Sequence, residues 1–189
     1  MELFLYIFYF VYVAMAISPI LIIFILNNEI QFIYRNMIFN HFCIITVIFI
    51  FSSIVSWIYI LLYKKYYKNK GSETMVCVEV EIAEPKYIPI YIAYFVIALS
   101  IKNNWIIFDI VFIIIYFLIL KGKFSYFNPY LLFFGYHFYE VQIENNLKEN
   151  AKYKLFLISN KKIKNIKNYN NLIRLNDFTY LDKGDKNDK

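Results

Sequence analysis

The chain has 189 residues, of which 60% are hydrophobic, and a formal net charge of +6. Soluble domains of this size are about 45–50% apolar. The excess of apolar residues is concentrated before residue 140, whereas the rest of the chain is rich in Lys and Asn. This distribution excludes a single soluble domain and indicates one membrane domain with a small soluble tail.

The sequence also lacks the patterns expected of an enzyme. It has no Gly-rich phosphate loop, no HExxH motif, no Ser-His-Asp order and no paired carboxylates within its apolar runs. Its two cysteines and two histidines are scattered, which does not match metal-ligand spacing. We therefore expect no catalytic activity, no metal and no cofactor. The 22% aromatic content is typical of an AT-rich genome and does not by itself indicate a stacking surface.

Four apolar runs can be distinguished: Leu3 to Leu26, Phe42 to Tyr63, Tyr87 to Ile101 and Trp105 to Leu120. At about 1.5 Å per residue, the first two exceed a hydrocarbon core of about 30 Å, and the last two are short. The first run lacks a basic start and continues past Ala16, which favours a retained span over a cleaved signal peptide. Because only residues 102–104 separate the last two runs, they are predicted to form a tight helical hairpin.

The basic residues predict the orientation of these runs. Of the 20 Lys and Arg residues, all but Arg35 and Lys102 follow the second or the fourth run. Basic residues beside membrane spans tend to remain cytoplasmic. The pattern predicts a four-span protein of the bacterial inner membrane, with its N-terminus, middle loop and C-terminus in the cytoplasm. A three-span protein, with the third run lying in the interface, is the alternative.

Four regions are therefore expected: a first transmembrane hairpin (1–63), a cytoplasmic loop with a strand (64–86), a second transmembrane hairpin (87–123), and a connector helix with a cytoplasmic β-domain (124–189). In the loop, Val76, Val78, Val80 and Ile82 alternate with more polar residues, which predicts a strand that buries its aliphatic face. A lone strand is unstable. We expect it to join the short apolar runs at 136–144, 153–159, 163–166, 172–175 and 178–181. The predicted fold class is four transmembrane α-helices with a small cytoplasmic antiparallel β-domain or partial barrel.

The segment after the fourth run has the residues of a capped connector. Asn128 is a favourable N-cap, and Pro129 suits the first helical position. Gly135 can adopt the left-handed conformation that ends a helix, and Tyr136 begins the next predicted strand. These residues predict a two-turn apolar helix at the membrane surface, which leads directly into the β-domain.

Three further groups are candidate functional residues. Asp109 lies about one turn inside the fourth run, where an ionisable group has a possible role in function; interfacial water could equally solvate it. Ser52 and Ser56 allow close helix approach, either within the bundle or between subunits. A basic cluster is predicted to contact anionic lipid, an acidic partner or the phosphates of nucleic acid, or to be a solvated turn that follows the positive-inside bias: Lys161, Lys162, Lys164 and Lys167.

The order of these elements resembles the KwaA family of the Kiwa anti-phage system. The resemblance covers residues 74–182 and rests on Asn128-Pro129, Gly135-Tyr136 and Tyr139, followed by the run 155–159, a Lys-rich turn and the run 172–177. It implies a homo-oligomer, thought to be a tetramer, that senses phage-induced disturbance of the envelope. It also implies a soluble partner resembling KwaB, which binds DNA, so that no direct nucleic-acid binding is expected of this chain.

Two functions remain as hypotheses. The first is a sensor and anchor in the lipid bilayer that recruits or controls a soluble DNA-binding effector. The second is a small oligomeric pore or holin-like protein, with Asp109 and the serines lining a channel. Flux measurements on liposomes separate them, because Asp109→Asn should alter conduction only in a pore.

Overall fold

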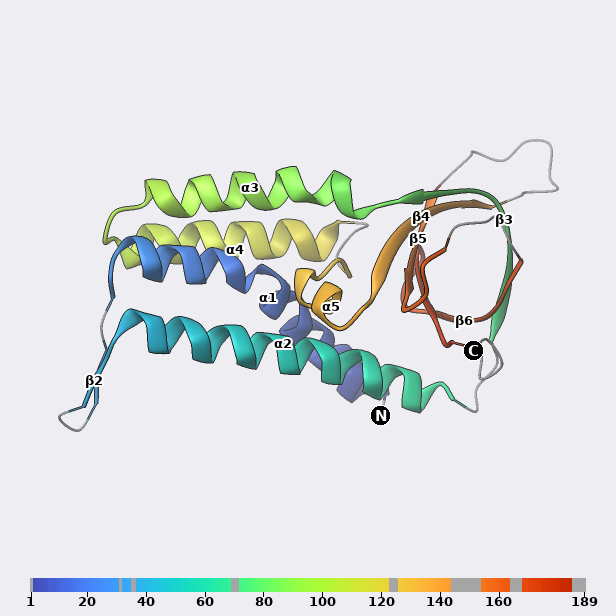
Figure 1. The fold of residues 1–189 in the computed structure, drawn as a ribbon, viewed down its shortest axis with the longest axis horizontal. Coiled ribbons are helices and arrows are strands. Elements are labelled where there is room, and N and C mark those ends of the chain that lie inside the picture. The colour runs from blue at the N-terminus through green and yellow to red at the C-terminus, as the bar shows by residue number, and fades with distance from the viewer. Residues whose placement is uncertain are drawn as a thin grey trace.

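The computed structural model describes residues 2–30, 32–34, 37–68, 72–122, 126–143, 154–163 and 168–184. A bundle of helices occupies one part of the molecule, and a β-barrel lies beyond one end of it (Figure 1). The helices of the bundle are α1 (Glu2–Asn27), α2 (His41–Tyr66), α3 (Glu84–Ser100) and α4 (Trp105–Lys121).

The helices coincide with the four apolar runs. Helix α1 contacts α2, α3 and α4, and therefore forms the centre of the bundle. The start of α4 is capped by the Asn104 side chain, which accepts a hydrogen bond from the Ile107 amide at 3.1 Å. Helix α3 begins earlier than its apolar run, at Glu84, because Pro85 is tolerated in the first turn of a helix. The starts of α1 and α3 and the ends of α2 and α4 all lie toward the barrel (Figure 1).

Two helical stretches among the described residues are long and apolar enough to cross a membrane: Leu3–Asn27 and His41–Tyr66. Helices α3 and α4 have 17 residues each. They would extend about 26 Å, slightly less than a hydrocarbon core of about 30 Å. Between α1 and α2, where only a loop was expected, the chain forms an antiparallel hairpin of β1 (Phe32–Tyr34) and β2 (Met37–Phe39).

The barrel combines the middle loop with the C-terminal tail, as predicted. It closes in the order β3-β4-β5-β7-β6. The strands are β3 (Glu73–Ile82), β4 (His137–Ile143), β5 (Lys154–Ser159), β6 (Asn168–Arg174) and β7 (Thr179–Asp182). The predicted run at 163–166 forms no strand at Ile163, and its remaining residues lie outside the described part of the chain.

The prediction of an antiparallel domain was wrong for one pair of strands. Strands β5 and β7 run parallel, with Phe156 opposite Thr179 and Ile158 opposite Leu181. All other pairs in the barrel are antiparallel. A closed ring of five strands cannot alternate in direction all the way round, so closure itself requires at least one parallel pair.

The predicted inward face of β3 was also wrong. Met75 and Cys77 are buried inside the barrel, whereas Val76 and Val78 are 49% and 48% exposed. The register shifts between Cys77 and Glu79. Such a bulge changes which residues face inward, and Val80 consequently packs against the barrel interior. Alternation alone could not show which set of residues faces the core.

Strand β5 is buried on both of its faces. Leu155 and Leu157 on β5 belong to its interior cluster. Phe156 and Ile158 on the same strand belong to a second cluster, which also contains residues of α1, α2, α3 and the segment after α4. Since β5 is buried on both faces, the barrel is packed directly against the end of the helical bundle.

Candidate functional site

The connector between α4 and β4 contains the short helix α5 (Pro129–Phe133). Asn128 caps it, because its Oδ1 accepts a hydrogen bond from the Tyr130 amide at 3.0 Å. Gly135 has a φ of 75°, in the left-handed region, and the Tyr136 amide returns to the Leu131 carbonyl at 3.1 Å. The caps predicted at Asn128, Pro129 and Gly135 are therefore present.

Helix α5 lies beside the middle of α2 (Figure 1). Its predicted place at the membrane surface stays a prediction. The ring centroids of Tyr130 and Phe133 lie 5.5 and 5.6 Å from that of Phe49, and the Phe134 ring stacks on Trp57 at 5.5 Å. Phe49 is about 25 Å along the helix axis from the barrel end of α2. The connector thus enters the bundle and returns from it before the barrel begins.

A buried polar network holds the connector at this depth. The Asn128 Nδ2 donates a hydrogen bond to the Ser56 Oγ at 2.8 Å, and that hydroxyl donates to the Ser52 carbonyl at 2.7 Å. The Ser18 Oγ donates to the Ser52 Oγ at 2.9 Å and lies 2.7 Å from the Tyr130 hydroxyl. Asn128 and Ser56 are both fully buried. Buried polar groups in an apolar setting are costly unless paired, so these bonds specify one position for the connector.

The network joins residues that the sequence analysis treated separately, namely the serines of α2 and the cap of the connector helix. Ser52 and Ser56 were expected to pack between spans, and Asn128 was expected to cap a surface helix. In the structure they bond to one another, so the serines face α1 and the connector within one chain. Asp109 lies elsewhere, with its side chain exposed on α4.

The two described residues of the basic cluster, Lys161 and Lys162, lie just after the end of β5. Lys161 is half-buried, and Lys162 is exposed. The Lys161 backbone is fixed, since its amide donates to the Ser159 Oγ at 3.1 Å and its carbonyl accepts from the Tyr139 hydroxyl at 3.3 Å. Lys164 and Lys167 lie outside the described residues. Contact of this cluster with lipid or a partner stays a prediction.

Tyrosines that the sequence did not single out connect α1 to the barrel through the connector. The Tyr12 hydroxyl, which is fully buried, donates to the Tyr126 carbonyl at 2.7 Å. The Tyr126 hydroxyl in turn donates to the Leu175 carbonyl, beyond the end of β6, at 3.3 Å. The partners are far apart in the chain, so no local pattern could have revealed them. The high aromatic content of the chain, which the sequence analysis attributed to codon usage, also gave no reason to single out these tyrosines.

An aromatic cluster joins α3, the connector and the barrel. The Tyr87 ring stacks on Phe127 with centroids 4.3 Å apart, and Phe127 contacts Phe138 of β4 at 4.7 Å. Phe156 of β5 lies 5.6 Å from both Tyr87 and Phe138. Aromatic pairs of this kind contribute about 0.5–1.5 kcal/mol beyond the area they bury. The first turn of α3 and two barrel strands consequently form one packed unit with the connector.

Ion pairs add a second attachment between α3 and the barrel. The Lys86 Nζ lies 2.6 Å from a carboxylate oxygen of Glu81 on β3 and 2.6 Å from one of Glu140 on β4. The Lys154 Nζ of β5 also pairs with Glu81, at 2.9 Å. Hydrogen bonds from Lys86 and then Lys154 lower the pKa of Glu81 to about 2. Because these groups are partly exposed, the pairs position α3 more than they stabilise the fold.

Through these contacts the connector is attached to both the helices and the barrel. Within the described part of the chain, no three His, Cys, Asp or Glu side chains lie close enough to hold a metal ion.

A movement of α1 against α2 would change the surroundings of Asn128 and Tyr126, and Tyr126 is bonded to the barrel. The arrangement can therefore transmit a displacement within the bundle to the barrel.

The fold thus defines a class of protein with a helical bundle, two membrane-length helices and a docked five-stranded barrel. A family model described as anti-phage protein KwaA matches residues 8–181, which include most of the bundle and nearly all of the barrel. The chain belongs to the KwaA family of anti-phage proteins. No curated protein and no solved structure matches it.

Proposed function

We propose a specific role for this chain within anti-phage defence, of which its membership of the KwaA family makes it a component. We propose that it is the membrane-embedded sensor and anchor of such a system, crossing the inner membrane four times. Its barrel would lie in the cytoplasm and dock a soluble DNA-binding effector that resembles KwaB. A homo-oligomer, thought to be a tetramer, is implied by the family and is part of the same proposal.

Closure of the barrel is the observation that carries the topology. Strand β3 precedes α3, and β4 follows α4, yet both belong to one closed sheet. A sheet cannot lie on both sides of a bilayer, so α3 and α4 must either both cross it or both stay out. This supports four spans over three. The last turns of α2 and α4, which contain Lys64, Lys65 and Lys121, also lie at the barrel end of the bundle, and this supports a cytoplasmic barrel (Figure 1).

Sensing would use the embedded connector. Helices α1 and α2 present large apolar residues to their surroundings, including Leu3, Ile7, Ile50 and Ile54. Changes in bilayer thickness or tension act on helix tilt. Such a tilt would reach the barrel through the polar network at Asn128, because the connector contacts both α2 and the barrel strands.

Co-purification tests the docking proposal. The full chain is expressed with the product of the neighbouring gene and isolated in mild detergent, beside a variant that lacks residues 136–189 and a control that lacks only residues 185–189. We expect the effector to co-purify with the full chain and the control, and phage protection to disappear with the larger deletion alone. Protection retained by a membrane-inserted protein without residues 136–189 would contradict the proposal.

A further inference from the structure

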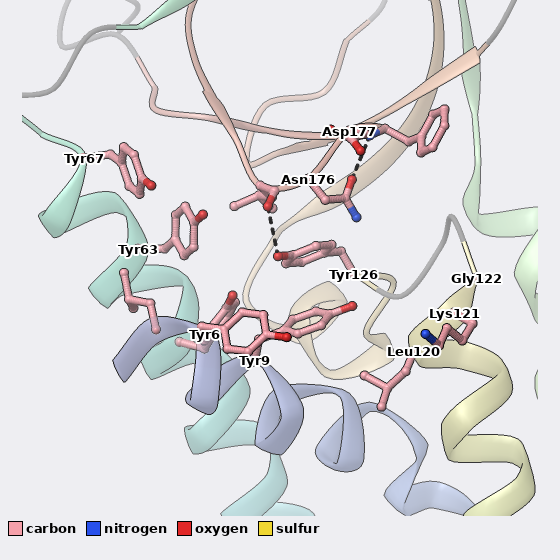
Figure 2. A pocket seen from close by; sticks show the side chains of 14 residues that line it. Tyr6, Tyr9, Tyr63, Tyr67, Leu120, Lys121, Gly122, Tyr126, Asn176 and Asp177 are labelled. Carbon is pink, nitrogen blue, oxygen red and sulfur yellow. Dashed lines mark hydrogen bonds between the residues drawn. The ribbon is translucent and has the colours of Figure 1, made fainter. Parts of the chain in front are cut away.

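A cavity of about 540 Å³ lies where the helical bundle meets the barrel (Figure 2). Pockets that hold small ligands measure about 300–1,000 Å³. Its walls come from the starting turns of α1, the final turns of α2 and α4, the connector and the turn between β6 and β7. Leu5, Tyr6, Tyr9, Leu120, Lys121 and Tyr126 are among the residues that line it.

The lining is amphipathic. Figure 2 shows the rings of Tyr9 on α1 and Tyr126 in the connector, with Asn176 of the barrel turn above Tyr126. Leucine and phenylalanine side chains supply further apolar wall. Tyrosines combine an apolar ring with a polar hydroxyl and are enriched where a membrane meets water. The cavity therefore suits a ligand that has both an apolar chain and a polar headgroup.

The charge of the lining favours an anionic headgroup. Asp177 is paired with Arg174, whose Nη2 lies 2.9 Å from the carboxylate. This pairing balances the negative charge, so the exposed ammonium of Lys121 leaves the lining positive. Lys121 also occupies the last turn of α4, at the end of the bundle that faces the barrel. A phosphate group would complement this position.

The cavity is continuous with surfaces that would contact lipid. Tyr6 on its wall is 62% exposed, and its neighbours Leu3 and Ile7 are 72% and 57% exposed. Gly122 lines both this cavity and a smaller one of about 180 Å³ between α3 and α4. Leu118, which is 67% exposed, lines the smaller cavity. An acyl chain could thus leave the cavity along an apolar path on α4.

We propose that this cavity binds one phospholipid of the cytoplasmic leaflet, with its phosphate beside Lys121 and an acyl chain against Leu5, Leu120 and the tyrosine rings. The inference rests on the proposed membrane embedding, which places this end of the bundle at the level of the headgroups. A bound lipid would contact α1, α2, α4 and the β6–β7 turn together. Its presence would therefore influence how the barrel sits on the bundle.

Native mass spectrometry of the full chain in mild detergent tests the proposal. Anionic phosphatidylglycerol, zwitterionic phosphatidylcholine and free glycerol 3-phosphate are added separately. We expect one retained lipid per chain, tighter retention of phosphatidylglycerol and no retention of glycerol phosphate. Equal retention of glycerol phosphate would overturn the assignment of a lipid, and equal retention of the two lipids would overturn the role of charge.

Matched variants assign the binding to this cavity. Lys121→Gln should weaken retention of phosphatidylglycerol about fivefold, whereas Lys65→Gln, at the same end of the bundle but outside the cavity, should leave it unchanged. Leu120→Trp should fill the cavity and weaken retention about tenfold or more, beside Phe117→Trp on the exposed face of α4 as control. Equal effects of the two lysine variants would overturn the site even if Leu120→Trp failed to fold.

A separate measurement distinguishes this inference from the proposed function. Extraction of cell membranes with alkaline carbonate shows whether the chain is embedded. An embedded chain that retains no lipid contradicts only the phospholipid site. A chain released by carbonate contradicts the membrane topology itself.

Discussion

The hydrogen bond between Asn128 and Ser56 gives the sharpest test of the embedded connector. Asn128→Ala removes two bonds, the cap on the Tyr130 amide and the bond to Ser56, which lie at 3.0 and 2.8 Å. Loss of an N-cap costs about 0.5–2 kcal/mol. Loss of the second bond adds about 0.6–1.7 kcal/mol, as for side-chain bonds between membrane helices. We expect the free energy of unfolding to fall by about 1–4 kcal/mol.

A double-mutant cycle isolates the bond itself. Asn128→Ala, Ser56→Ala and the double variant are unfolded reversibly in mixed micelles, and the coupling free energy should be about 0.6–1.7 kcal/mol. Ser53→Ala is the matched control, because the Ser53 hydroxyl is also buried on α2 but has no hydrogen-bond partner among the described residues. Additive effects within about 0.3 kcal/mol would refute the reasoning, as would a coupling of Asn128 to Ser53 as large as that to Ser56.

Four further outcomes are expected. Lys86 and Lys154 lower the pKa of Glu81 to about 2. The ionised Glu81 therefore stabilises the fold above its unfolded pKa of about 4.3, and this stabilisation is lost as the pH falls toward 2. In acid unfolding experiments, the Glu81→Gln variant should show a smaller loss of stability over this pH range than the unchanged chain. Burial raises the pKa of Cys77 to about 11, so alkylation at pH 8, followed by peptide mass spectrometry, should leave Cys77 unmodified until the barrel unfolds; rapid labelling of the native chain would show that the barrel is open. Gly135→Ala should cost about 1–2 kcal/mol in thermal or denaturant unfolding, because φ is 75° there; an unchanged stability would argue against the left-handed turn. Asp109→Asn should leave liposome flux unchanged, whereas altered conduction would favour the pore.

The fold followed largely from local patterns. Four apolar runs gave the four helices, and the alternation at 75–82 gave β3. Asn128, Pro129 and Gly135 gave the caps of α5, because a helix end depends on neighbouring residues alone. Predicting that β3 joins the tail required only the argument that a single strand is unstable. These features depend on residues that are close together in the sequence, so a single sequence is enough to predict them.

The rest depended on contacts between distant segments. The depth of α5 follows from the bond between Asn128 and Ser56, and neither residue indicates the other in the sequence. The parallel pair of β5 and β7 follows from closure of a five-stranded ring. The exposure of Val76 and Val78 follows from the bulge beside Cys77 and from which face the barrel encloses. Tyr12 and Tyr126 were missed because their partners are carbonyl groups in other elements.

The proposal that the barrel lies beneath four membrane crossings is tested most directly by reporters fused at two points of the chain. One reporter follows residue 189, beyond the barrel, and the other is inserted at Asn103 between α3 and α4. We predict that green fluorescent protein will fluoresce at the first position and that alkaline phosphatase will be active only at the second. Phosphatase activity beyond residue 189 would contradict this topology. Absence of phosphatase activity at Asn103 in a membrane-inserted chain would contradict it as well. Either result would also remove the basis for the proposed coupling between the helical bundle and a cytoplasmic effector.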